Sequence, residues 1–420
     1  NWARSSAPDG GHAGRMGDFR MNRSWMFLAM VGLALGQVSA ADWPQYRGPD
    51  RNGISPETGL QLDWRERAPK LLWQAEMHDG GYAGPAVANG VLFIVDHVGD
   101  DDIVRAQNLT TGLKIWEFAY AAPTKDNYGF ACSTPAVDEG LVYTVSRQGA
   151  VHCITADKGQ LVWRRDVSKE VGAKLPDWQV AVSPVIDGDI VLVPGGGPGP
   201  YLVALNKKTG VPLASGGGVD KLGYSTPVIA TLNGAKQYLL FTAEGLVGVN
   251  ATTLEPVWKQ EWKTRYDVNA ADPIQVGPDR VYITSGYNRG CGVVQVRGSE
   301  AELVWENREI QAHFSCSILH EGMIYGTGDP GNLVCLDPRT GRAIWKQRGF
   351  QKGGLVGVQG HMIVANGGNG ELTVVELNPK AYVAKGTIKP LGGQTWTAPI
   401  VADKKLVVRN TKALAVLDLN

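Results

Sequence analysis

Tryptophan recurs along this chain at a near-constant interval, and no other feature constrains the fold more. The recurring residues are Trp73, Trp116, Trp163, Trp258, Trp305 and Trp345. Ala214 and Ala384 fill two further positions of the same series, which gives eight positions separated by 39 to 51 residues. Self-similarity at this period indicates a repeat architecture, and a unit of this length holds about four strands.

A short turn phrase precedes most of these tryptophans. Two copies read Ala106-Gln-Asn-Leu-Thr-Thr-Gly-Leu-Lys-Ile-Trp116 and Cys335-Leu-Asp-Pro-Arg-Thr-Gly-Arg-Ala-Ile-Trp345. In most copies a small residue lies ten positions before the tryptophan, and an Asn or Asp that favours turns lies eight positions before it. The phrase therefore predicts a strand, a tight turn and a second strand that carries the tryptophan.

A second landmark opens an inner strand in each unit. Clear copies are Ser133-Thr-Pro-Ala-Val137 and Ser225-Thr-Pro-Val-Ile229, and Ser315-Cys-Ser-Ile318 and Gly353-Gly-Leu-Val356 are weaker copies without proline. Proline suits the first residue of a strand because that residue need not donate a ladder hydrogen bond. The landmark occurs eight times, and alternating strands with Gly, Asn and Asp turns follow it.

The two ends of the chain together complete one repeat. Val416-Leu-Asp-Leu-Asn420 matches the turn phrase but stops before its tryptophan, whereas Pro69-Lys-Leu-Leu-Trp73 has a tryptophan strand without the phrase. We therefore predict an all-β, eight-bladed β-propeller over residues 69–420, with four-stranded blades and ring closure by N- and C-terminal strands. The tryptophans would dock neighbouring blades, so that truncation of one to alanine costs about 3–5 kcal/mol.

Residues before the ring divide into three predicted segments. Residues 1–20 are polar and Gly-rich, which indicates a disordered segment or a mis-called upstream extension. Residues 21–40 read as a Sec-type signal peptide, because Arg23 precedes an apolar run and Val38-Ser-Ala40 is a small-residue cleavage site. The apolar run is too short to span a membrane, and the residue directly after the cleavage site is Ala41 and not a cysteine. We expect an exported protein, periplasmic or secreted, without a lipid anchor.

The third segment, residues 41–68, is expected to be an N-terminal extension that packs on the ring. We expect burial of Trp43, Tyr46 and Trp64 against the ring. Arg47 and Arg51 are expected to pair with carboxylates.

Composition excludes several function classes. The chain has 41 basic and 41 acidic side chains in 420 residues, which argues against binding to nucleic acid or to an anionic membrane. Of the five cysteines, Cys153 and Cys335 occupy the small position of the turn phrase, so we interpret them as core residues. The spacing of the cysteines and histidines supports no metal site, and no hydrolase motif occurs.

The repeated phrase A-x-N/D-x-x-T-G-x-x-x-W resembles the quinoprotein-type (PQQ-like) propeller repeat over residues 69–420. One branch of that family contains the assembly lipoprotein BamB and BamB-like proteins. This branch implies a non-catalytic scaffold with a protein or peptide partner in the cell envelope. The stretch from Trp43 to Gly53 further resembles the leader of exported PQQ-like proteins typical of planctomycete-type bacteria.

The other branch contains PQQ-dependent alcohol and sugar dehydrogenases, which implies an alternative function with PQQ and calcium as cofactors. Those enzymes typically carry two adjacent cysteines over the quinone, and no two cysteines are adjacent here. The resemblance assigns no catalytic residue, quinone ligand or metal ligand to this chain. We therefore predict a scaffold without cofactor, which is expected to be a monomer.

The candidate binding site is the rim of the central funnel, just before the inner strands. Its predicted members are Tyr82, Trp178, Gln179, Tyr224, Asn269, His313 and Trp396. Aromatic and amide groups that converge from several blades suit a small ligand, a peptide or a carbohydrate. Two alternatives remain open: these residues pack the rim, or a partner strand adds to the outer edge of a blade.

Overall fold

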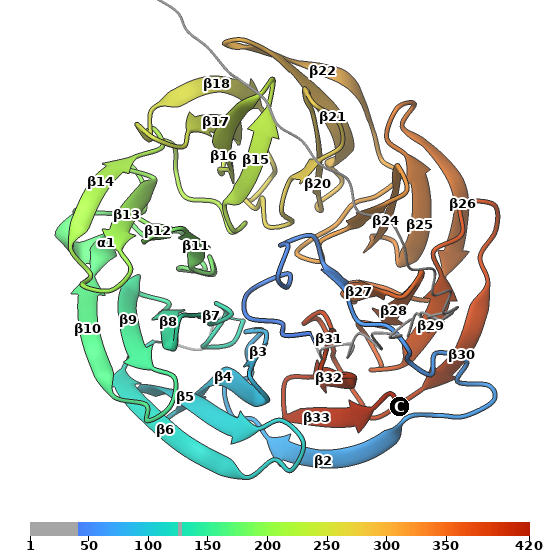
Figure 1. The fold of residues 1–420 in the computed structure, drawn as a ribbon. Coiled ribbons are helices and arrows are strands. Elements are labelled where there is room, and N and C mark those ends of the chain that lie inside the picture. Colours follow the sequence, from blue (N-terminus) through green and yellow to red (C-terminus); the bar gives the residue numbers. More distant parts are fainter. Residues whose placement is uncertain (1–40, 125–127) are drawn as a thin grey trace, which may run out of the picture. The chain divides into compact units, whose positions relative to one another are not determined.

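Eight four-stranded antiparallel sheets are arranged as blades around a central axis (Figure 1). The computed structural model describes residues 41–124 and 128–420. The predicted upstream extension (1–20) and signal peptide (21–40) lie outside the described residues. The described residues form 33 strands and one single-turn helix, α1 (Val167–Glu170), so the prediction of an all-β, eight-bladed propeller is confirmed.

The first four blades follow one another along the chain, each from its innermost to its outermost strand. Blade 1 holds β3 (Ala86–Ala88), β4 (Val91–Val98), β5 (Asp101–Asn108) and β6 (Lys114–Ala121). Blade 2 holds β7 (Ala136–Asp138), β8 (Leu141–Val145), β9 (Ala150–Thr155) and β10 (Leu161–Asp166). Blade 3 holds β11 (Val185–Asp187), β12 (Ile190–Pro194), β13 (Leu202–Asn206) and β14 (Pro212–Gly216). Blade 4 holds β15 (Val228–Leu232), β16 (Ala235–Phe241), β17 (Gly245–Asn250) and β18 (Pro256–Glu261).

The remaining blades complete the ring. Blade 5 holds β19 (Ile274–Gln275), β20 (Arg280–Ser285), β21 (Gly290–Arg297) and β22 (Glu300–Asn307). Blade 6 holds β23 (Ile318–His320), β24 (Met323–Gly328), β25 (Asn332–Asp337) and β26 (Arg342–Arg348). Blade 7 holds β27 (Leu355–Val358), β28 (His361–Ala365), β29 (Leu372–Glu376) and β30 (Ala384–Ile388), with β1 (Ile54–Ser55) added at its inner edge. Blade 8 holds β31 (Ile400–Ala402), β32 (Lys405–Arg409), β33 (Ala413–Asp418) and β2 (Lys70–Glu76).

Burial differs between the middle and the outermost strands of a blade. The middle strand β4 is buried over six consecutive residues, whereas the outermost strand β6 alternates between exposed and covered positions. Middle strands lose both faces to neighbouring blades, which explains their continuous hydrophobic runs; an outermost strand keeps one face in water and alternates. The core therefore lies between blades rather than within any one of them.

The ends of the chain share blade 8, as the split repeat predicts. Strand β2 pairs antiparallel with β33, and Trp73 lies opposite Val416. A buried ion pair joins the same region, because Arg409 Nη2 of β32 lies 2.6 Å from Oδ1 of Asp79, which follows β2. Both side chains are fully buried. Closure thus combines a strand pairing with a charged contact shielded from water.

The turn phrase has a direct structural meaning. The small residue and the tryptophan lie opposite each other in the strand pair, as in Ala106 opposite Trp116. The Trp116 indole reaches the next blade, where its Nε1 donates to the Ala156 carbonyl at 2.9 Å and its ring covers Gly159. A Cβ on Gly159 would lie 2.5 Å from the indole, and its φ of +67° also favours glycine. Trp73, Trp163, Trp305 and Trp345 likewise donate to a carbonyl of the following blade.

Trp258 is the exception among the six tryptophans. The next blade joins β21 to β22 through the short turn Gly298-Ser299, which lacks the longer Thr-Gly turn and its carbonyl acceptor. The Trp258 Nε1 atom donates instead to Gln237 Oε1 of its own blade at 2.8 Å. Its ring is still buried in a cluster with residues of blade 5, such as Val281. Trp258 therefore packs between blades without a hydrogen bond to the next one.

The two positions without tryptophan are filled by other side chains. The turn of blade 4 that faces the Ala214 position carries Leu254, whereas the corresponding turns of other blades carry glycine. This leucine is buried against blade 3. Leu254 adopts a φ of +58°, so the backbone keeps the glycine conformation although the residue has changed. In blade 7, Trp64 of the N-terminal extension lies against Gly386. Both blades keep four strands in order.

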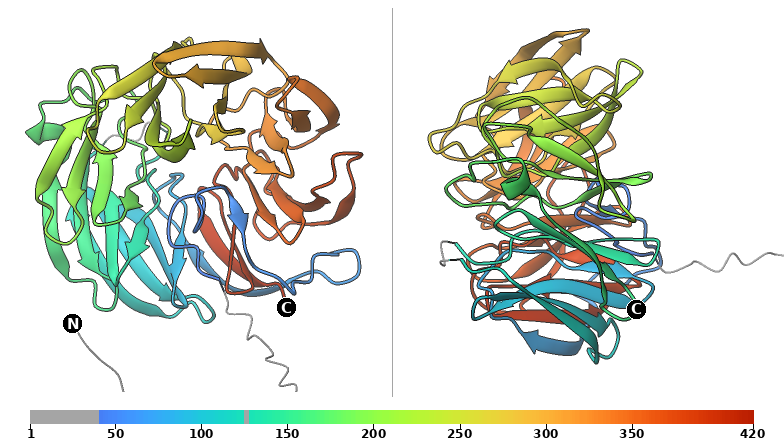
Figure 2. Two further views of the ribbon diagram at one scale, coloured as in Figure 1. Left: turned by 45° about the horizontal axis from the view of Figure 1, so that its top comes forward. Right: turned by 90° about the vertical axis from the view of Figure 1, so that its left-hand side faces the viewer.

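The N-terminal extension crosses the ring near its axis (Figure 1) and lies at one face of it (Figure 2). It bonds to blade after blade: Trp43 bridges Val87 of blade 1, and Pro44 accepts from Val137 of blade 2. In blade 7, Ile54 pairs with Gly357. Trp43 and Trp64 are buried, whereas Tyr46 is half-buried.

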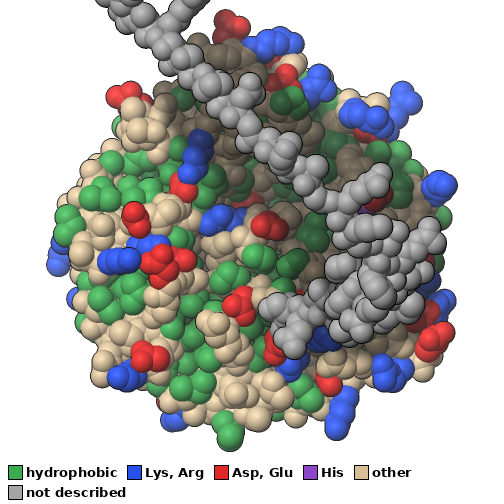
Figure 3. All heavy atoms as spheres, viewed as in Figure 1, with side chains coloured by type: hydrophobic (Ala, Val, Ile, Leu, Met, Phe, Trp, Pro, Cys, Tyr) green, Lys and Arg blue, Asp and Glu red, His purple; other side chains and the backbone are tan. Residues whose placement is uncertain are grey.

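The two arginines of the extension differ. Arg47 Nε lies 4.0 Å from Asp272 Oδ2, as expected of a residue paired with a carboxylate. The expectation of a carboxylate partner for Arg51 was wrong, since its guanidinium donates to the backbone carbonyl of Ile186. The uncovered part of the face in Figure 3 carries basic and acidic side chains interleaved, in line with the balanced charge.

Candidate functional site

A cavity of about 460 Å³ lies at the centre of the ring. All eight blades and the N-terminal extension contribute residues to its lining. Its volume falls within the range of roughly 300–1,000 Å³ that is usual for small-ligand sites. The centre of the ring is therefore a pocket with a defined lining and is the candidate binding site.

Five of the seven predicted rim residues line this cavity. They are Tyr82, Trp178, Tyr224, His313 and Trp396. Asn269 and Gln179 are not among the lining residues, and the structure gives each another contact. The fully buried Asn269 amide donates to the carbonyls of Thr242 at 2.8 Å and Trp262 at 3.0 Å, so it fixes a loop of blade 4. Gln179 Oε1 accepts from the Thr124 hydroxyl at 2.7 Å.

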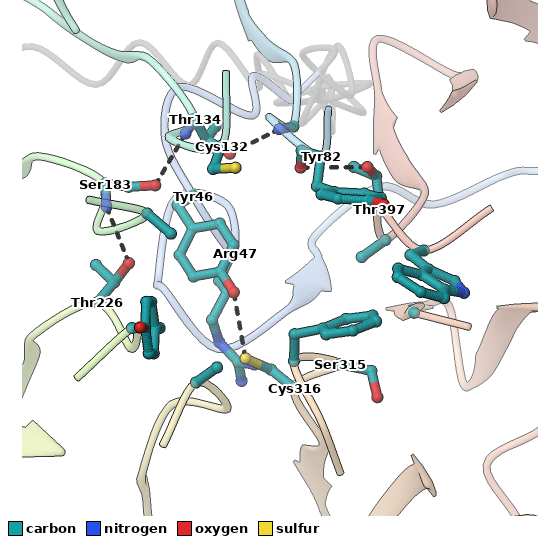
Figure 4. A pocket seen from close by; sticks show the side chains of 18 of the residues that line it. Tyr46, Arg47, Tyr82, Cys132, Thr134, Ser183, Thr226, Ser315, Cys316 and Thr397 are labelled. Carbon is teal, nitrogen blue, oxygen red and sulfur yellow. Dashed lines mark hydrogen bonds between the residues drawn. The ribbon is translucent and has the colours of Figure 1, made fainter. Parts of the chain in front are cut away.

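A chain of hydrogen bonds connects successive blades around the cavity (Figure 4). The backbone N–H of one residue donates to the side chain of its counterpart in the next blade. Thr134 N donates to Ser183 Oγ at 2.9 Å, and Ser183 N donates to Thr226 Oγ1 at 3.2 Å. The latch residues, as we name this series, are Gly84, Thr134, Ser183, Thr226, Asp272 and Cys316. Sequence reasoning missed this role, although the signal was present in the Ser or Thr before the inner-strand proline.

The N-terminal extension forms the floor of the cavity. Tyr46 Oη lies 3.3 Å from Cys316 Sγ (Figure 4). Arg47 donates to the Ser317 carbonyl at 2.9 Å. Asp272 lies beside Arg47 and is buried, and this burial raises the pKa of its carboxyl to about 7 against the opposing effect of Arg47. The extension thus lies across the central cavity, which we call the cup. The sequence did not indicate that the extension enters the site.

Aromatic rings form two walls of the cup. On one side, the centre of the Trp396 ring lies 5.4 Å from the centre of the Tyr82 ring and 4.8 Å from that of Phe314. On the other side, the centre of the Trp178 ring lies 6.3 Å from the centre of the Tyr128 ring and 6.0 Å from that of Tyr224. These separations are typical of interacting aromatic pairs, which support one another in fixed orientations. The walls offer rigid apolar contact area to a ligand.

Nitrogen-bearing side chains supply the charge of the cup. Arg147 donates to the carbonyls of Gly129 at 2.6 Å and Trp178 at 2.9 Å. The Lys352 Nζ atom lies 6.0 Å from the centre of the Trp396 ring. His313 Nε2 lies 2.5 Å from Asp329 Oδ2, and burial of the His313 ring lowers its pKa although Asp329 opposes this effect.

Two thiols line the cup, and both favour the protonated form. Burial raises the pKa of Cys132, and burial also raises the pKa of Cys316. A protonated thiol is a poor nucleophile and a poor metal ligand. Cys316 instead accepts the backbone N–H of Asp272 at 3.2 Å, so it takes part in the latch.

The described lining does not fit calcium or a quinone held by calcium. Calcium takes carboxylate and other oxygen ligands, and none of the described lining residues is Asp or Glu. The described part of the chain also contains no group of three or more His, Cys, Asp or Glu side chains placed to hold a metal ion. All five cysteines are free thiols, so no disulfide covers the cup.

Sequence comparison shows that this chain is similar to outer membrane protein assembly factors. A family model described as outer membrane protein assembly factor BamB matches residues 100–347. BamB from Yersinia pestis is 23% identical over 367 residues, which cover 81% of this chain and 86% of the relative. BamB from Burkholderia pseudomallei (strain K96243) is 25% identical over 267 residues, or 62% of this chain and 61% of the relative.

Solved structures share the fold at lower identity. BamB from Moraxella catarrhalis superposes with a TM-score of 0.58 at 14% identity, covering 83% of this chain and 97% of that structure. A europium-containing methanol dehydrogenase gives 0.60 at 12% identity, covering 90% and 98%. Among the described residues, no helix has the length and apolar character needed to cross a membrane. Because the matching family model spans more than half of its residues, this chain belongs to the family of outer membrane protein assembly factor BamB.

Proposed function

We propose that this protein is a non-catalytic, exported propeller that binds a protein partner in the cell envelope as an assembly scaffold. The chemistry of the cup is the observation that carries the proposal. Its described lining supplies aromatic walls, protonated thiols and fixed cations, but no carboxylate and no metal-ligand set. These groups offer contact and orientation to a partner, and the Asp329 carboxylate beside the lining already has His313 as its partner.

The rigidity of the rim supports a binding role. Aromatic side chains carry much of the energy of protein interfaces because they bury a large area at a small entropic cost. In the cup, Trp178, Tyr224 and Phe314 lie on loops that the latch residues tie from blade to blade. The loop of Trp396 is tied instead to Tyr82, which accepts hydrogen bonds from Gln394 and Thr397. A partner would therefore meet a preorganised surface, which reduces the entropy lost on binding.

The relatives support the cellular setting of the proposal. Two BamB proteins named as outer membrane protein assembly factors align with most of the propeller. We extend that setting to this chain, with residues 21–40 as its export signal and a monomer as its working form. A quinone-dependent dehydrogenase is the competing function, and the lack of carboxylates in the described lining opposes it.

Site-specific photo-crosslinking in the native cell envelope tests the proposal. A photoreactive residue replaces Tyr128, which is 62% exposed at the cup, and the control carries it at Leu113, which is 69% exposed on an outer turn. We expect one discrete protein adduct from position 128 that is missing from position 113. Identical adducts at both positions, or none at 128, would contradict the proposal. Turnover of an alcohol or sugar after addition of PQQ and calcium would replace it with the dehydrogenase.

A further inference from the structure

We infer that the cup binds the C-terminal end of a polypeptide, with the terminal carboxylate at Lys352 and an apolar or aromatic last side chain between the aromatic walls. This inference rests on the proposed function, because it takes the partner to be a protein. It adds which part of the partner enters the cup and which groups recognise it. Three properties of the cup lead to it: a closed floor, an available cation and apolar walls.

The closed floor selects a chain end. Tyr46 and Arg47 lie across the bottom of the cavity and are fixed there by Cys316, Ser317 and Asp272. An extended chain therefore does not pass through the ring along its axis. A cavity of about 460 Å³ with these residues across it suits a terminus or a short tip of a partner.

The cationic side chains of the cup differ in whether hydrogen bonds to the protein already occupy them. Arg147 donates to the carbonyls of Gly129 and Trp178, and Arg47 donates to the Ser317 carbonyl beside Asp272. These bonds hold both guanidinium groups in the framework. Their positive charges still favour an anion in the cup, because charges interact more strongly where water is excluded.

Lys352 is the cation that remains available. In the described part of the chain, no carboxylate lies within ion-pair distance of its Nζ atom, and its described contact is with the Trp396 ring. An ammonium group that lines a largely apolar cavity is a suitable partner for a carboxylate. A chain N-terminus would be disfavoured, since it would add a further positive charge to a lining that already holds three cationic side chains and whose described residues include no Asp or Glu.

The aromatic walls select the side chain that accompanies the carboxylate. Trp396 contacts both Phe314 and Tyr82, and Lys352 lies over the same indole. A carboxylate at Lys352 therefore places the attached residue along this wall. Apolar and aromatic side chains gain most from such a position, because each buries its area against rings with little hydration to lose.

Fluorescence polarisation with labelled peptides tests this inference on the purified protein. The probes are a pentapeptide ending in phenylalanine with a free carboxylate, the same peptide as its C-terminal amide, and one ending in serine with a free carboxylate. We expect the free acid ending in phenylalanine to bind at least about ten-fold more tightly than either alternative. The amide loses a charged hydrogen-bond partner, and the peptide ending in serine loses the burial of an aromatic side chain. Equal affinities for acid and amide would overturn the inference.

Two substitutions at the site and one remote control complete the test. Lys352→Met is expected to remove the preference for acid over amide, whereas Lys352→Arg retains it. Lys158→Met removes an exposed lysine on an outer turn of blade 2 and is expected to leave the affinity unchanged. Far-UV circular dichroism verifies that each variant is folded. A preference for the acid that survives Lys352→Met would contradict the assignment of this lysine.

One further arm separates a chain end from a small carboxylate. 3-Phenylpropionate carries the same ring and carboxylate without a peptide chain, and we expect it to compete at least about ten-fold more weakly than the peptide because it forgoes the remaining chain contacts. Equal potency would overturn the choice of a chain end. Failure of all peptides together with persistent adducts from position 128 would refute this inference alone, whereas loss of those adducts would refute the scaffold function itself.

Discussion

Substitution of Gly159 by alanine tests the blade-docking geometry at one atom. Gly159 adopts a φ of +67°, and an added Cβ would lie 2.5 Å from the Trp116 ring of the preceding blade. Gly298 occupies the outer turn of blade 5 with a φ of +63°, and an added Cβ would meet nothing within 4 Å. The two glycines thus share the backbone conformation and differ in whether a tryptophan covers them.

The expected costs follow from these contacts. An L-residue with a left-handed backbone costs about 1–2 kcal/mol, and this is the whole expected cost of Gly298→Ala. Gly159→Ala adds overpacking against the indole, about 1–3 kcal/mol. Displacement of the ring also weakens the 2.9 Å hydrogen bond from Trp116 to the Ala156 carbonyl, about 1 kcal/mol. We expect a total of roughly 3–6 kcal/mol for Gly159→Ala from these terms.

Equilibrium unfolding in guanidinium chloride, followed by far-UV circular dichroism, gives both free energies of unfolding. A double-mutant cycle with Trp116→Ala isolates the contact, because Gly159→Ala should cost only the backbone term of about 1–2 kcal/mol once the ring is gone. Equal destabilisation by Gly159→Ala and Gly298→Ala would refute tight docking. So would a cost of Gly159→Ala that is unchanged in the Trp116→Ala background.

Three further predictions concern buried charges. Asp79→Asn leaves Arg409 buried without its counter-charge and is expected to cost about 3–5 kcal/mol in chemical unfolding, most of which the double variant Asp79→Leu/Arg409→Met recovers. Burial raises the Asp272 pKa from 3.8 to about 7, so the folded state holds this proton more tightly and the protein loses stability as the pH rises across that window. Asp272→Asn keeps an acceptor for Thr226 N, and it should reduce the pH dependence of the free energy of unfolding measured between pH 5 and 8. Burial lowers the His152 pKa from 6.5 to about 3, so stability falls as the pH drops through that range. His152→Phe should therefore reduce the difference in Tm between thermal melts at pH 4 and pH 7.

The fold was predictable because most repeats carry the same residue types at the same spacing. The distance from the small residue to the tryptophan is constant in most copies, and it corresponds to one register in the strand pair, as in Ala106 opposite Trp116 and Cys335 opposite Trp345. The split repeat at the chain ends likewise predicted the pairing of β2 with β33. Such signals are local in sequence, so a single chain suffices to read them.

The site was only partly predictable, because its decisive contacts join residues far apart in the sequence. The position before the inner strand placed Trp396 and His313 at the cup. It also suggested Asn269, which turns inward because its amide satisfies two backbone carbonyls. The pairing of Tyr46 with Cys316 spans 270 residues, and no spacing rule reports a contact of that kind.

The repeats also separate the residues that build the ring from those that give the cup its character. Where tryptophan becomes Ala214, the facing glycine position becomes Leu254, so the volume between the blades is restored. The latch, by contrast, has no side-chain acceptor at Gly84 of blade 1, nor at the corresponding positions of blades 7 and 8, where Gly354 lies directly against Ala398. Lys352 and Trp396 stand two residues before these two positions. The available cation and the central indole of the cup thus come from two of the three blades in which the latch acceptor is missing. The binding specificity that we propose therefore lies where the repeat is least regular.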